Sequence, residues 1–140
     1  MKTRFTPLVK MKKDLMDKRE RELQKANSDL QIAQSALDEA YRDLQSAQTP
    51  SAGSIKELQM AQSVITSQRS IIQQKQEWVD FAASQVDQAQ QHFKEAMVES
   101  EKFKYLEAEE LKLILQAQKK QQQMQMDEVA IQTFTRKEVF

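Results

Sequence analysis

The stretch SAQTPSAGSIKEL, residues 46–58, contains the only glycine of the chain, Gly53, and one of its two prolines, Pro50. Proline disfavours the helical conformation in the residue before it, and glycine adopts backbone dihedrals that other residues avoid. Ser54 and Glu57 have the spacing of a capping box, which satisfies free amide groups at the start of a helix. The stretch therefore predicts a helix that ends at about residue 48, a turn over residues 49–54, and a second helix that begins at about residue 55.

Large apolar residues recur every seven positions on both sides of this turn. They are Val9, Met16, Leu23, Leu30, Leu37 and Leu44 before it, and Leu58, Ile65, Ile72, Val79, Val86 and Phe93 after it. The intervening position of each repeat is mostly small: Phe5, Ala26, Ala33, Ala40 and Ala47 in the first segment, and Ala61, Ala82, Ala89 and Ala96 in the second. Lys12, Arg19, Gln68 and Lys75 interrupt these two columns. Such a repeat is typical of a coiled-coil seam.

The two columns face each other if the chain folds back at residue 51. The numbers of the paired residues, from Leu44 with Leu58 to Val9 with Phe93, then always add up to 102. The predicted fold is all-α, a long antiparallel two-helix coiled-coil hairpin in one domain, with helices over about 5–48 and 55–133 and a tail over 134–140. This pairing ends near residue 100, while the helical pattern continues to about residue 133. The second helix therefore overhangs, and the overhang binds a partner, self-associates or frays.

The composition argues against a catalytic or metal-binding protein. The chain has no cysteine, a single histidine, His92, and a single glycine, so disulfides, thiolate metal sites, a catalytic triad and a glycine-rich phosphate loop are not expected. We expect no enzyme activity, cofactor or metal. The N-terminus lacks the apolar core of a signal peptide, and no stretch has the length of a membrane span. We expect a soluble intracellular protein.

The charges are unevenly distributed although the net charge is zero. Residues 1–25 carry a net charge of +5, residues 26–118 of −6, and residues 119–140 of +1. The basic end would suit an acidic partner surface, a membrane or nucleic acid, and it is equally consistent with a solvated helix face.

Two groups of apolar residues lie outside the seam. Met60, Val64, Ile71 and Trp78 share one outward strip of the second helix, which suits a partner helix or dimerisation. The C-terminal MQMDEVAIQTFTRKEVF, residues 124–140, combines large apolar residues with charges of both signs. It suits either a binding segment or a frayed tail.

The sequence resembles the FliJ family, the small coiled-coil stalk and chaperone proteins of flagellar type III export, and their injectisome counterparts. The resemblance rests on FTPLVKMKKDLMDKRERELQKA (5–26), the central break, and MDEVAIQTFTRK (126–137). It implies a hairpin similar to the central stalk of rotary ATPases, located in the cytoplasm at the face of the membrane that carries the export apparatus. The implied partners are the hexameric export ATPase, the cytoplasmic domain of the export-gate membrane protein and export chaperones. Nucleic acid is not among them, and membrane association occurs only through partners.

The resemblance also implies which residues bind these partners. The ATPase-binding residues would be Phe5, Leu8, Lys12, Lys13, Arg19, Met124, Asp127, Glu128, Ile131, Phe134, Arg136 and Lys137. Aligned through the QEW around Trp78, the gate-binding residues would be Met60, Val64, Ser67, Ile71 and Trp78.

Two other functions are also consistent with the sequence. The chain could be a structural coiled-coil spacer or homodimer, or a holdase similar to prefoldin. Prefoldin subunits usually carry β-hairpins between their helices, and residues 49–54 leave no room for one. The sequence does not separate flagellar from injectisome use.

Overall fold

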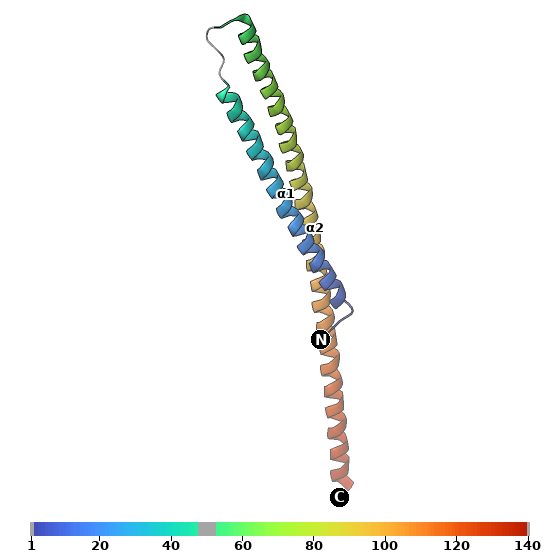
Figure 1. Ribbon diagram of the computed structural model, residues 1–140. Helices are drawn as coiled ribbons and strands as arrows, with labels where there is room; N and C mark the ends of the chain where they lie inside the picture. Colours follow the sequence, from blue (N-terminus) through green and yellow to red (C-terminus); the bar gives the residue numbers. More distant parts are fainter. Residues whose placement is uncertain (1, 48–52, 140) are drawn as a thin grey trace. The chain divides into compact units, whose positions relative to one another are not determined.

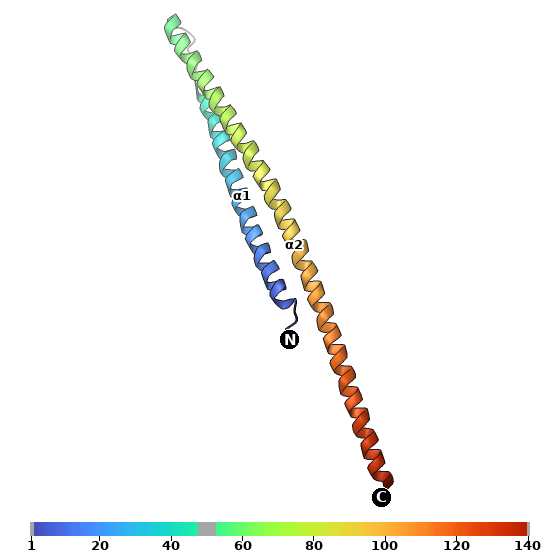
Figure 2. The same cartoon turned by 90° about the vertical axis from the view of Figure 1, so that its right-hand side faces the viewer.

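The computed structural model describes residues 2–47 and 53–139, and these form two helices (Figure 1). Helix α1 spans Thr6–Ser46 and α2 spans Ile55–Val139. The helices are antiparallel and pack against each other in both views (Figures 1 and 2). The prediction of an all-α helical hairpin is confirmed.

The packing divides the chain into two units. The hairpin unit is Met16–Ala96, in which most of α1 packs on the first half of α2. The end unit combines Met1–Leu15 with Met97–Phe140. In the end unit, α2 continues alone beyond the start of α1.

The core of the hairpin unit is the predicted seam. Its buried hydrophobic residues are Ala33, Ala40, Ala82, Val86 and Ala96, and Ala33 has no exposed surface. The large residues of the α1 column, such as Leu23, Leu30 and Leu37, are half-buried. Alanine at the intervening positions brings the backbones close together, because a methyl group is the largest group between them. The seven-residue pattern therefore identified the buried face of both helices.

The predicted pairing register is wrong in the end unit. The rings of Phe5 and Phe103 lie 6.5 Å apart between centroids, and their numbers add up to 108 instead of 102. Lys12 Nζ lies 3.7 Å from Glu99 Oε2, and Arg4 Nε lies 3.1 Å from Glu110 Oε2. The observed register is thus displaced from the predicted one by about one seven-residue repeat.

The hairpin unit shows the same displacement at its tip. Leu58, the predicted partner of Leu44, is 42% exposed, and the first half-buried residue of α2 is Ala61. A pairing in which residue numbers add up to about 109 instead places Leu44 level with Ile65, which is half-buried. His92 is also among the groups that lower the pKa of the Glu22 carboxyl, so the two residues lie near each other. In the predicted register they would be far apart. A shift of seven residues leaves the same columns facing each other, so periodicity cannot distinguish the two registers.

The ends of the helices follow from local hydrogen bonds. The backbone N–H of Glu57 donates to Ser54 Oγ at 3.2 Å, which caps α2 as predicted. The backbone N–H of Phe5 donates to Thr3 Oγ1, and the backbone N–H of Thr3 donates to Thr6 Oγ1, so these threonines cap α1.

The role predicted for Gly53 is wrong, because Gly53 has no positive φ. An added Cβ would lie 2.5 Å from Glu57 Oε2, the end of a flexible side chain that can move aside, so this contact does not require glycine. Pro50 and most of the predicted turn 49–54 lie outside the described residues. At the other end, α2 includes most of the expected tail 134–140, because it continues to Val139.

Candidate partner-binding surfaces

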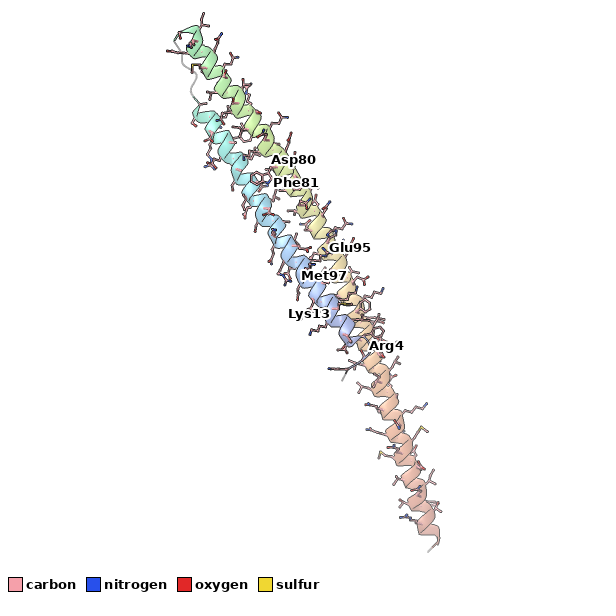
Figure 3. The ribbon with its side chains drawn as sticks, turned by 45° about the vertical axis from the view of Figure 1, so that its right-hand side comes forward. Arg4, Lys13, Asp80, Phe81, Glu95 and Met97 are labelled. Atoms are coloured by element: carbon pink, nitrogen blue, oxygen red, sulfur yellow. The ribbon has the colours of Figure 1, made fainter. Side chains whose placement is uncertain are left out.

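The beginning of α1 is held on α2 by a compact set of contacts, which we call the N-terminal contact. It consists of Arg4, Phe5, Thr6 and Lys12 from the N-terminal segment with Glu99, Phe103, Glu107 and Glu110 from α2. Figure 3 labels Arg4 at this point of the molecule. The two phenylalanine rings are inclined by 53°, an arrangement that favours aromatic pairs. The hydroxyl of Thr6 donates to Glu107 Oε1 at 3.4 Å.

Cations cover both aromatic rings of this contact. The guanidinium carbon of Arg4 lies 4.9 Å from the centroid of Phe5, and Lys12 Nζ lies 5.4 Å from the centroid of Phe103. Lys12 thus contacts both an aromatic face and the carboxylate of Glu99. Of the basic residues expected to bind the ATPase, Lys12 interacts with other residues of the chain, whereas Lys13 is exposed (Figure 3).

Arg19, another of these basic residues, is also paired within the chain. Its Nη1 donates to Glu22 Oε2 at 2.9 Å. This hydrogen bond is the main cause that lowers the pKa of Glu22 below its usual value, with further help from the charges of Arg19 and Lys18. The guanidinium favours the charged carboxylate, so protonation of Glu22 occurs at lower pH than in an isolated side chain.

We expect Arg19→Ala to raise the pKa of Glu22 back toward its usual value, because the largest cause of its depression is removed. A pH titration of the Glu22 carboxyl carbon by NMR measures this shift. Lys25→Ala is the matched control, since it removes an exposed cation that has no part in lowering this pKa. An unchanged Glu22 pKa in Arg19→Ala would contradict the assignment.

The C-terminal part of α2 is exposed on all sides. Every residue from 115 to 136 is exposed, and we call this range the uncovered segment. Met124, Ile131 and Phe134, expected to bind the ATPase, are each more than 60% exposed. Asp127, Glu128 and Arg136 are exposed as well, and the side chain of Lys137 lies outside the described part of the chain. Leu8 is half-buried near the start of α1.

The uncovered segment presents two apolar faces, of which the sequence analysis identified only one. At 100° per residue, Ala117, Met124 and Ile131 lie within about 40° of one another. On the opposite side Leu115, Met126 and Val129 are also exposed. Met126 and Val129 line a shallow groove with Gln122, Gln125 and Ala130. The spacing of three and four residues from Met126 to Val129 and Ala130 is the sequence signal that could have revealed this second face.

The residues expected to bind the export gate lie together on the hairpin unit. We call Met60, Val64, Ser67, Ile71 and Trp78 the tip strip; all five are exposed. At 100° per residue they lie within about 60° of arc on α2. Lys75 Nζ lies 5.2 Å from the centroid of the Trp78 ring and covers part of it. The nearby Phe81, labelled in Figure 3, is 63% exposed and was not recognised in the sequence.

Residues 2–47 and 53–139 contain no group of three His, Cys, Asp or Glu side chains that could hold a metal ion. Neither α1 nor α2, over the residues described, has a stretch apolar enough to cross a membrane.

A comparison with known protein families gives a match over almost the whole length. The model of the family described as flagellar FliJ protein matches residues 1–139. The chain belongs to the FliJ family. Comparison with curated proteins and with solved structures gives no match.

Membership in the FliJ family makes the chain a component of flagellar type III protein export. Because the match extends to residue 139, it includes the uncovered segment as well as the hairpin unit. Both candidate surfaces of this FliJ-family chain therefore lie within the matched region.

Proposed function

We propose that this FliJ-family chain is the central stalk of the hexameric export ATPase and connects it to the cytoplasmic domain of the export gate, without chemistry of its own. The proposed partners also include export chaperones. The observation that carries the proposal is the uncovered segment, a helix that presents apolar residues and charges of both signs on its surface. A single helix with large exposed apolar residues is stabilised by a protein that surrounds it.

The uncovered segment supports the ATPase part of the proposal in particular. A helix inside a ring of subunits meets protein on more than one side, and this segment has apolar faces on opposite sides. An asymmetric stalk contacts only some subunits of a sixfold ring at a time. Its binding therefore favours particular subunit conformations and couples their nucleotide cycles, so ATP hydrolysis increases.

The tip strip supports the gate part of the proposal. It belongs to the hairpin unit, whereas the uncovered segment belongs to the end unit, so the two surfaces can bind different proteins. Trp78 and the neighbouring aliphatic residues are of the kind that contribute most to protein interfaces.

We expect Met60→Asp with Val64→Asp to weaken binding of the gate domain at least tenfold, because two carboxylates would be desolvated in the interface. Binding to the ATPase should remain unchanged. Gln62→Asp with Gln73→Asp is the control, since it adds the same charge at exposed positions on another side of α2. Titrations with each purified partner measure both affinities. Loss of both partners, or of neither, would contradict a separate gate-binding surface.

Binding to the ATPase should weaken as salt increases. The basic residues Lys13 and Arg136 are exposed and would attract acidic loops of the ring, and salt screens such attractions. Association rates measured at several salt concentrations test this. A rate independent of salt would exclude electrostatic steering.

A further inference from the structure

We propose that α1 can slide along α2 by one seven-residue repeat, and that the N-terminal contact holds the hairpin in the register observed. A protein that displaces the N-terminal contact would then change the pairing along the hairpin. The sliding is a property of the isolated chain, independent of any export partner.

The first observation is that the seam is compatible with both registers. A pairing in which residue numbers add up to 109 places Leu37 level with Ile72 and Leu30 with Val79. After a shift by seven they are level with Ile65 and Ile72. A large apolar residue therefore faces another in either arrangement. The shift moves α1 by about 10 Å toward the beginning of α2, at 1.5 Å per residue.

The second observation is that two seam residues have unfavourable surroundings in the observed register. Ser100 has no exposed surface, and its Oγ has no hydrogen-bond partner. Leu58 belongs to the same column and is 42% exposed. An unpaired buried hydroxyl and an exposed leucine both destabilise the pairing. After the shift Ser100 would be level with residue 2, at the end of the pairing, and Leu58 would be level with Leu44.

The third observation is what opposes the shift. The Phe5–Phe103 pair exists only in the observed register, together with the contacts of Lys12 with Glu99 and of Thr6 with Glu107. The Arg4 side chain is 78% exposed, so its ion pair with Glu110 contributes little. The aromatic pair is therefore the principal element that selects the register.

Two pairs of engineered cysteines distinguish the registers, because the natural chain has no cysteine. Leu44→Cys with Ile65→Cys reports the observed register, and Leu44→Cys with Leu58→Cys reports the shifted one. Disulfides require Cα atoms within about 7 Å of each other, so each pair closes in one register only. Crosslinking within single chains is measured in dilute protein under one mild oxidant, and helicity is measured by circular dichroism.

We expect the otherwise unchanged chain to crosslink mainly through the 44/65 pair. Phe5→Ala should increase crosslinking of the 44/58 pair about tenfold, because it removes the aromatic pair. Met11→Ala, which shortens an exposed side chain of the same helix, is the control and should change neither pair. If Phe5→Ala only frayed the end of α1, crosslinking of the 44/58 pair would not increase, and the aromatic pair would not be the element that selects the register.

A second variant tests sliding with the aromatic pair intact. Ser100→Asp places a carboxylate in a fully buried position of the observed register and in an exposed one of the shifted register, so crosslinking of the 44/58 pair should increase. Val98→Asp adds the same charge at an exposed position and should not have this effect. If neither Phe5→Ala nor Ser100→Asp increases 44/58 crosslinking, or if either increases it only with loss of helicity, the proposal is wrong.

Discussion

Removal of residues 118–140 should abolish the stimulation of the export ATPase. The truncated chain lacks nearly all of the uncovered segment, including Met124, Ile131 and Phe134, and so loses the surface proposed to enter the ring. It retains the hairpin unit and all residues of the N-terminal contact. ATP hydrolysis by the purified ATPase, with the full-length and the truncated chain, measures the effect.

The truncation needs a control that separates loss of contact from loss of length. Met124→Asp with Ile131→Asp keeps the helix and charges one apolar face, and should also lower stimulation strongly. Gln121→Asp with Gln132→Asp adds the same charge at exposed glutamines of the uncovered segment and should lower it less. Undiminished stimulation by the truncated chain would remove the uncovered segment from the mechanism.

Val86→Asp should largely unfold the hairpin unit. Val86 is 7% exposed and belongs to the seam. A pairing in which residue numbers add up to 109 places it level with Leu23. The substitution removes a buried apolar side chain and places a carboxylate there, a cost of about 3 kcal/mol or more. Two helices bury little surface, so this cost is comparable to the stability expected for the whole unit. Thermal unfolding followed by circular dichroism measures the loss.

The neighbouring Gln85→Asp is a strict control for this result. It introduces the same residue and the same charge in the same turn of α2, but at an exposed position. Its cost should be limited to helix propensity, about 0.5 kcal/mol. If both variants lost equal stability, the seam assigned to α2 would be incorrect.

The sequence predicted the fold class and the buried face, because burial in a coiled coil follows a period that can be counted. It did not predict the register, because a repeat of seven is unchanged by a shift of seven. Only contacts outside the repeat determine it, and the pair of Phe5 with Phe103 is such a contact. The exposure of Leu58 at the tip is the consequence that the sequence analysis missed.

The sequence predicted which apolar residues of the tip strip are exposed, but not which charged residues are paired within the chain. The exposure of Met60 and Val64 follows from their angle to the seam, and the structure shows both exposed. Whether a charged side chain is available for a partner depends instead on neighbours that periodicity does not reveal. Lys12 is near Glu99 only in the observed register, and Arg19 bonds Glu22 within its own helix.

The polar residues within the seam bear on which helix pairs with which. Arg19 and Lys75 are half-buried. A pairing in which residue numbers add up to 108, as they do for Phe5 with Phe103, places them level with Ala89 and Ala33, whose small side chains leave room for long ones. If two copies of α1 or of α2 paired in parallel instead, arginine would face arginine and lysine would face lysine. Like charges across a seam are destabilising, and alanine would then face alanine across a gap. The same interruptions that weaken the repeat thus discriminate against parallel pairing of identical helices and favour pairing of α1 with α2.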